Sequence, residues 1–288
     1  MSTGKLTDLP SAVRRLVHPG STVYLGNFGA QLFSVGHEMI RQRITGIDAV
    51  IASGGLLMDQ LLGAGTLRSA TYGHCWSPVG PSPAWNFRRA AERGDTTVRL
   101  HELSLGMMTA ALTAGAWGVP FMPVPGLPGT GYETEDWPQG RRARATCAFG
   151  TADVVAALVP DVAFVHVDLA DPEGNGTVRG PVGEVVVAAQ AARAVVLVAE
   201  EITDAAAVRT AGVTVPGLLT THVVHRPGAV APDGAIGRYD RDVSAYARYA
   251  RCAATPEGFR DWLAETVAVR EPGSPADPAT TRPRGGRE

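Results

Sequence analysis

Gly26-Asn27-Phe28-Gly29-Ala30 is the first segment of the chain that could do chemistry, and it follows a short β-rich run. Glycines let backbone N–H groups approach a ligand closely, and the helix expected after the loop adds unpaired N–H groups. Such a loop can hold a phosphate, a carboxylate or an oxyanion. It is neither a dinucleotide fingerprint nor a P-loop. A tight strand-to-helix turn would need the same glycines, so a purely structural role stays open.

Glu102-Leu103-Ser104 lies where a predicted strand gives way to a predicted helix. The Glu102 carboxylate could act as a general base or as a nucleophile. Ser104 suits the N-cap of a helix, and a glutamate at a strand end often only pairs with backbone donors. A catalytic role and a structural role therefore both fit this segment.

The histidines are scattered, and none forms a recognisable metal motif. His74 lies before an aromatic stretch, while His166 and Asp168 share one face of a predicted strand. No Cys-x-x-Cys and no His-Glu-x-x-His is present, so the sequence predicts no metal site. A lone histidine on a strand is more often a hydrogen-bonded core residue than a ligand.

Glu200 and Glu201 form a further acidic pair, which is predicted to follow a strand that ends at Ala199. Carboxylates at the carboxyl end of a parallel strand lie where α/β proteins usually bind ligands. They can equally cap the next turn, and the residues alone do not decide between these two roles.

Strand and helix signals alternate along the chain, which predicts an α/β fold with an open, mostly parallel sheet flanked by helices. Residues 121–144 are expected to be irregular, and a long loop of this kind is often functional. We predict one domain over residues 1–269 and a disordered tail over 270–288, because the tail is dense in Pro, Gly and charge. The predicted strands are 22–25, 47–52, 67–72, 97–102, 161–167 and 194–199, and the predicted helices are 33–44, 83–93, 104–117, 184–193, 241–251 and 256–267.

Composition limits the classes of function. The 288 residues carry a formal charge of −2, with 45% hydrophobic and 19% charged residues, which is typical of a folded globular protein and not of a nucleic-acid binder. Residues 103–132 hold no charge but contain four prolines, so we expect a buried helix followed by a buried strand and loop instead of a membrane span. Three isolated cysteines and no signal peptide predict a cytoplasmic protein.

Taken together, the segments resemble the A (alpha) subunit of class I coenzyme A transferases of the glutaconate CoA-transferase type. Gly26-Asn27-Phe28-Gly29 stands where that family has a G-G-[FW]-G loop after its first strand. Glu102-Leu103-Ser104 and residues 107–123 resemble the family's E-x-S run leading into A-G-x-x-G-[VI]-P-F. Residues 160–203 resemble its A-D-x-A-x-x-H-x-x-x-A-D-x-x-G-N segment with the later V-E-E-I. The likeness extends to about Val269.

The resemblance implies an open α/β subunit that pairs with a homologous B subunit. CoA would move from an acyl-CoA to a carboxylic acid through a glutamyl-CoA intermediate, and the nucleophilic glutamate would belong to the B subunit. The CoA thioester would be a substrate, and no bound cofactor or metal is expected. We assign Glu102 a catalytic role, and we assign substrate or CoA binding to the glycine-rich loop, Ser104 and His74. Arg88 or Arg89 could hold an acyl carboxylate or a CoA phosphate, or could simply face solvent.

Two residues depart from the family pattern and leave alternatives open. Asn27 replaces the second glycine of the loop, and Leu105 stands where ring-opening hydrolases of the family have the second glutamate of E-x-x-E-G. An apolar Leu105 cannot act as a base, which weighs against that hydrolysis. The alternatives are an acyl-CoA hydrolase, decarboxylase or lyase on the same scaffold, or a non-catalytic acyl-CoA-binding subunit.

Overall fold

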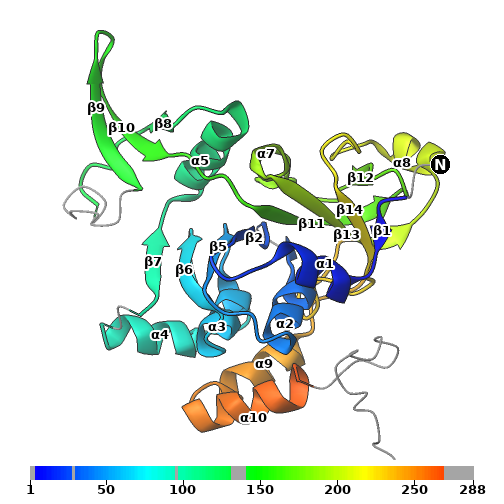
Figure 1. Ribbon diagram of the computed structural model, residues 1–288. Coiled ribbons are helices and arrows are strands. Elements are labelled where there is room, and N and C mark those ends of the chain that lie inside the picture. Colours follow the sequence, from blue (N-terminus) through cyan, green and yellow to red (C-terminus); the bar gives the residue numbers. More distant parts are fainter. Residues whose placement is uncertain (1–3, 28–29, 95–96, 131–140, 269–288) are drawn as a thin grey trace, which may run out of the picture.

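The computed structural model describes residues 4–27, 30–94, 97–130 and 141–268. Its centre is a mostly parallel sheet covered by helices (Figure 1), which confirms the predicted α/β architecture. The predicted tail over 270–288 lies outside the described residues. Neighbouring strands run parallel in the order β1 (Leu6–Thr7), β14 (His222–His225), β13 (Ala194–Ile202), β11 (Val162–Ala170), β2 (Thr22–Tyr24), β5 (Ile47–Ile51), β6 (Leu67–Tyr72) and β7 (Arg99–Glu102), and the short β12 (Gly176–Thr177) pairs antiparallel with β11.

The sheet separates the apolar core into two parts, one on each of its faces, and helices cover both parts. α5 (Leu105–Trp117) and α7 (Val185–Ala191) cover one face. On the other face, Figure 1 shows α9 (Val243–Cys252) and α10 (Pro256–Thr266) packed beneath the remaining helices. That face is covered by α1 (Leu9–Leu16), α2 (Phe33–Arg41), α3 (Gly55–Gly63), α9 (Val243–Cys252) and α10 (Pro256–Thr266), with α4 (Trp85–Glu92) against α3, while α8 (Ala205–Ala211) lies near β11 and β12.

Local sequence signals explain why the predictions of β11 and α5 are confirmed. β11 is a run of apolar and β-branched residues, and both of its faces are buried, as expected for a central parallel strand. α5 begins where Ser104 Oγ accepts a hydrogen bond from Met107 N at 3.2 Å, and it ends at Gly118, which has a left-handed backbone. No helix in the described part of the chain is long and apolar enough to cross a membrane.

Several predicted boundaries were wrong. α4 begins at Trp85 instead of residue 83, because the N-cap position falls on Ala84. α3 was missed, since its nine residues are almost all apolar and show no helical periodicity. The region 121–144 is not wholly irregular, because β8 (Phe121–Val124) and the start of β9 (Arg142–Cys147) lie in it. The buried strand expected there is mostly exposed, with Phe121 at 44%.

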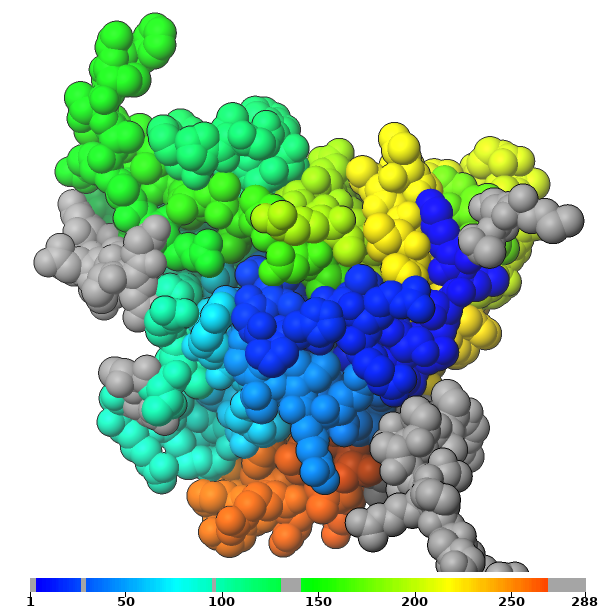
Figure 2. All heavy atoms as spheres, in the orientation of Figure 1, coloured from blue at the N-terminus to red at the C-terminus, as the bar shows by residue number. Residues whose placement is uncertain are grey.

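β8, β9 and β10 (Gly150–Ala156) form a separate antiparallel sheet with β10 in the middle. Figures 1 and 2 show the β9–β10 hairpin standing clear of the rest of the molecule. Its tip carries Phe149, whose side chain is fully exposed.

The strand order places a topological switch between β2 and β11. From β2 the chain moves outward through β5, β6 and β7, whereas β11, β13 and β14 build the other half of the sheet. Ligands of open α/β sheets bind outside the carboxyl ends of the strands at such a point. The loop that leaves β2 is the glycine-rich loop, so the topology directs attention to it.

Candidate functional site

The glycine-rich loop forms a small hairpin directly after β2. β3 (Gly26–Asn27) pairs antiparallel with β4 (Ala30–Gln31), with Gly26 opposite Gln31 and Asn27 opposite Ala30. Gly26 has a φ of +99°, and a Cβ built on it would lie 2.1 Å from the Ala30 carbonyl oxygen. Glycine is therefore required at this position, both for the backbone conformation and for the close approach. The predicted binding residues Phe28 and Gly29 lie outside the described residues.

The helix after the hairpin does not offer the open N-terminus that the sequence predicted. Leu32, the N-cap of α2, is fully buried, and its N–H donates to the Leu25 carbonyl at 3.2 Å. The N–H of Ser34 donates to the Ala229 carbonyl at 3.1 Å. Because protein groups occupy these donors, the start of α2 does not present them to a ligand.

Glu102 and His74 are brought together on one side of the hairpin. His74 follows the end of β6, and its Nε2 lies 2.9 Å from Ser53 Oγ. Glu102 is the last residue of β7, and its side chain is exposed. Burial lowers the pKa of His74, and the negative charge of Glu102 partly offsets this effect. The two residues are thus close enough for each charge state to affect the other.

Ser104 and Leu105 lie beside this pair at the start of α5. The Ser104 oxygen caps the helix, and the hydroxyl proton stays available to a ligand. Leu105 is 40% exposed, and its side chain lies where a Cβ on Gly73 would be, next to His74. The position is apolar, so Leu105 gives Glu102 no second acidic residue there.

A polar cluster on the other side of the hairpin was not assigned as a site from the sequence. His166 Nε2 lies 2.9 Å from Glu200 Oε1, and the Tyr239 hydroxyl donates to the same oxygen at 2.7 Å. Glu200 lies within β13, which runs to Ile202, and not after a strand that ends at Ala199. The register of β11 and β13 explains the pairing, because His166 lies beside Val198 and so faces Glu200 across the strands.

The hairpin joins these two groups of residues. Ala30 lines the same cavity as His166 and Tyr239. On the other side, Gln31 Oε1 accepts a hydrogen bond from Leu57 N at 3.3 Å, at the start of α3. The glycine-rich hairpin therefore lies between the two groups of polar residues at the carboxyl edge.

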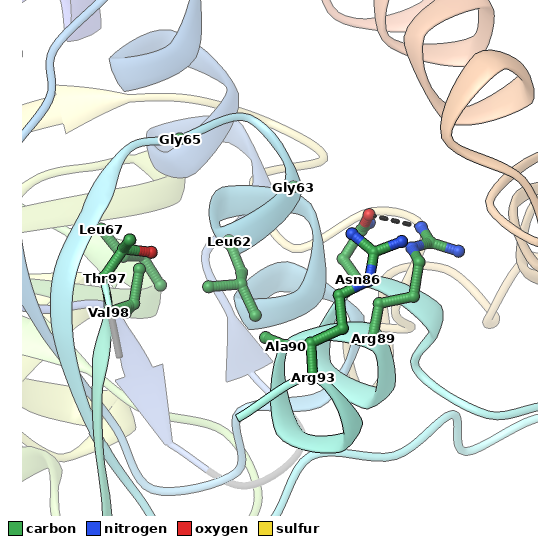
Figure 3. Close-up of a pocket in the computed structure, with 10 residues that line it drawn as sticks. All are labelled: Leu62, Gly63, Gly65, Leu67, Asn86, Arg89, Ala90, Arg93, Thr97 and Val98. Atoms are coloured by element: carbon green, nitrogen blue, oxygen red, sulfur yellow. Dashed lines mark hydrogen bonds between the residues drawn. The ribbon is translucent and has the colours of Figure 1, made fainter. Parts of the chain in front are cut away.

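Figure 3 shows a different cavity of about 430 Å³ at the amino ends of β6 and β7. Arg89 lies beside Asn86 there and donates to Asn86 Oδ1 at 2.7 Å and to the Ala253 carbonyl at 3.0 Å. Arg88 pairs with the exposed Glu92 at 2.7 Å. Both arginines thus have protein partners, and the cavity lies at the end of the sheet opposite the glycine-rich hairpin.

Charged side chains do not gather into a metal site in the described ranges. No three His, Cys, Asp or Glu residues are close enough together to hold a metal ion among the residues that the structure describes. The three cysteines, Cys75, Cys147 and Cys252, are all free thiols.

Comparison with known proteins identifies the family. The coenzyme A transferase family model matches residues 6–226. This chain belongs to the coenzyme A transferase family. It is 30% identical to the A subunit of 3-oxoadipate CoA-transferase from Pseudomonas knackmussii, over 91% of this chain and 93% of that protein. It is 28% identical to the A subunit of glutaconate CoA-transferase from Acidaminococcus fermentans, over 91% of this chain and 88% of that protein.

The fold agrees with this assignment. The crystal structure of glutaconate CoA-transferase from Acidaminococcus fermentans superposes with a TM-score of 0.84 at 24% identity, covering 92% of this chain and 89% of that chain. The resemblance inferred from the motifs is therefore confirmed, and the chain shares its family and its fold with these A subunits. Enzymes of this family use CoA thioesters as substrates.

Proposed function

We propose that this chain is the A component of a two-subunit enzyme that moves CoA between an acyl-CoA and a carboxylic acid. A homologous B subunit supplies the nucleophilic glutamate, whose motif is absent from this sequence. The glycine-rich hairpin at the switch point between β2 and β11 is the observation that carries the proposal. Relatives that are themselves A subunits, and that align over nine tenths of this chain, support the need for a partner.

The chemistry divides the work between the two subunits. The partner's carboxylate attacks the thioester carbonyl, and backbone N–H groups of the hairpin stabilise the oxyanion that forms. CoA leaves as a thiolate, which then attacks the glutamyl carbonyl of the mixed anhydride, releasing the acid and forming the glutamyl-CoA thioester. The acceptor acid then attacks the glutamyl-CoA thioester, and the same steps run in reverse to form the new acyl-CoA. No water is consumed.

Glu102 and His74 lie on one flank of the hairpin, and we assign them to the acyl side of the site. Burial lowers the pKa of His74 and the Glu102 charge only partly offsets this, so the imidazole is available as a neutral proton acceptor beside the reacting groups. Ser104 contributes a hydroxyl donor at the same edge. Leu105 offers no base in this region, which favours transfer to an acid over hydrolysis.

Native mass spectrometry of the tagged chain, purified from its own host, tests the assembly. We expect a stoichiometric partner of similar size. Incubation of that complex with acyl-CoA and then hydroxylamine should convert one glutamate of the partner into a hydroxamate, which peptide mapping locates. A hydroxamate on Glu102 of this chain, or a homo-oligomer that exchanges CoA without a partner, would contradict the proposal.

The requirement for an acceptor separates transfer from the other activities of the scaffold. With the complex in hand, we expect acyl-CoA consumption only when a carboxylic acid is present. Consumption without an acceptor would indicate a hydrolase or decarboxylase. A Gly26→Ala substitution that leaves exchange unchanged would instead indicate a chain that binds acyl-CoA without contributing to catalysis.

A further inference from the structure

A cavity of about 520 Å³ opens beside the glycine-rich hairpin on the carboxyl edge of β11 and β13. Residues 234–241 line it together with Val178, Arg179 and Pro181. Ala30 of the hairpin also lines it, so the cavity is continuous with the loop that would face the thioester. Much of the lining is apolar, including Val178, Pro181 and Ile236, which is suited to an acyl chain.

Glu200 holds two of the residues that line this cavity, His166 and Tyr239. Its carboxylate accepts hydrogen bonds from His166 Nε2, the Tyr239 hydroxyl, and the backbone N–H groups of Gly228 and Ala229. Burial alone would raise the pKa of Glu200, but these donors outweigh burial and hold the pKa below its ordinary value. The carboxylate is therefore ionised at neutral pH and can only accept hydrogen bonds.

This contact fixes the orientation of His166. Because an ionised carboxylate cannot donate, Nε2 carries a proton and donates it, which leaves Nδ1 as the ring nitrogen for a ligand. Among the described residues, Nδ1 has no hydrogen-bond partner, and it is not one of the fully buried polar atoms. The His166 side chain is 13% exposed and lines the cavity. The cavity thus presents one oriented ring nitrogen that suits a hydroxyl group, since a hydroxyl can both donate and accept a hydrogen bond.

The cations around the cavity already face carboxylates. Arg238 donates to Asp168 Oδ1 at 2.7 Å and to Glu201 Oε2 at 2.8 Å. Arg179 pairs with Asp168 at 3.2 Å, and Arg241 pairs with Asp233 at 3.1 Å. Each of these three guanidinium groups is therefore neutralised within the described part of the chain, so the site is better suited to an uncharged substituent than to a second carboxylate.

We infer that this cavity takes the acyl chain of the CoA thioester and that His166 selects acyl groups carrying a hydroxyl, which hydrogen-bonds to Nδ1. The inference rests on the proposed function, because it takes the hairpin to face the thioester. His166 is then a specificity-determining residue, and Glu200 is the positioning residue that holds its ring in this orientation.

The test compares butyryl-CoA with 2-, 3- and 4-hydroxybutyryl-CoA as donors, with acetate as acceptor and the enzyme in complex with its partner. We expect at least one hydroxy ester to exceed butyryl-CoA in kcat/KM by about tenfold, since an unmatched buried polar atom costs about that much. In His166→Gln the amide can still donate to Glu200, but the contact at Nδ1 is lost, so the ratio should fall to about one. His222→Gln, on β14, is the matched control and should keep the wild-type ratio.

The outcomes separate this inference from the proposed function. Exchange by the wild-type complex without any preference for a hydroxy ester would overturn the inference, as would a preference that survives in His166→Gln. If that variant fails to assemble, Ile236→Trp serves instead, because Ile236 is 60% exposed at the cavity wall and a larger ring would fill the cavity. A preference retained in Ile236→Trp would also overturn it, whereas no exchange with any ester would count against the proposed function.

Discussion

Gly26 and Ala30 approach so closely that a Cβ on Gly26 would lie 2.1 Å from the Ala30 carbonyl oxygen. Neither the Gly26 backbone nor the Ala30 carbonyl can move away without opening the β3–β4 hairpin to which both residues belong. The hairpin stands at the switch point of the sheet, between the Glu102–His74 pair and the His166–Glu200 pair. The geometry of the hairpin therefore depends on the absence of a side chain at Gly26.

Gly26→Ala should abolish most CoA exchange. The added methyl group must displace the hairpin, and a shift of about 1 Å at reacting groups costs about 100-fold in rate. Gly106→Ala is the matched control, because nothing lies within 4 Å of a Cβ there and the position is in α5. Steady-state exchange in the partner complex measures both variants. Near-normal exchange by Gly26→Ala would show that the hairpin is not used in catalysis.

Glu200→Gln should destabilise the protein in a pH-dependent way. At neutral pH the amide cannot satisfy the four donors that the carboxylate accepts, which costs about 2–4 kcal/mol of unfolding free energy. The folded pKa of Glu200 lies below the ordinary value of 4.5, so its stabilisation is full above that pH and is lost as pH falls through the folded pKa. The difference between wild type and variant should therefore narrow below about pH 4.5.

Urea denaturation at several pH values checks this expectation. Glu201→Gln is the control, since Glu201 is half exposed and has one ion pair with Arg238, which is worth less than about 1 kcal/mol. A constant difference between wild type and Glu200→Gln from pH 7 down to well below pH 4.5 would mean that the charge of Glu200 does not contribute.

Asp59→Ala should weaken the packing of three helices. Asp59 is fully buried on α3, and it accepts hydrogen bonds from Phe87 N at 2.7 Å and Asn86 Nδ2 at 3.2 Å on α4, and from the Tyr249 hydroxyl at 2.5 Å on α9. Removal leaves the Phe87 N–H and the Tyr249 hydroxyl without this acceptor, while Asn86 Nδ2 still donates to the Tyr249 oxygen, so we expect a loss of about 3 kcal/mol or more of unfolding free energy. Asp261→Ala, on the exposed side of α10, should change it by less than about 0.5 kcal/mol. Equal losses in both variants would contradict this account.

The sequence predicted the elements whose signals are local. A continuous apolar run predicted β11, and Ser104 before an apolar stretch predicted α5 with its cap. The glycine spacing predicted a special loop after β2, and its hairpin form agrees with that expectation. These signals act over a few residues, so no knowledge of the rest of the fold was needed.

Contacts between distant residues could not be predicted in the same way. His166, Glu200 and Tyr239 meet only because β11 and β13 are adjacent and the segment after β14 folds back over them. Their separation in sequence, by 34 residues between His166 and Glu200, hides that relationship. α3 was missed for a different reason, since a helix that is buried on nearly every side has no amphipathic period.

Glu102→Gln should lower the pKa of His74 further. Burial is the main cause of the lowered pKa of His74, and the Glu102 charge is the described influence that opposes it. Removal of that charge leaves burial unopposed, so the imidazole should lose its proton at lower pH. NMR titration of the His74 ring in the folded chain measures this directly, and Glu92→Gln is the control because Glu92 pairs with Arg88 on the exposed side of α4. If Glu102 works with His74 in proton transfer, the acid limb of the exchange rate should move with the titration, and a titration shift without any change in the pH profile would assign Glu102 a purely structural role.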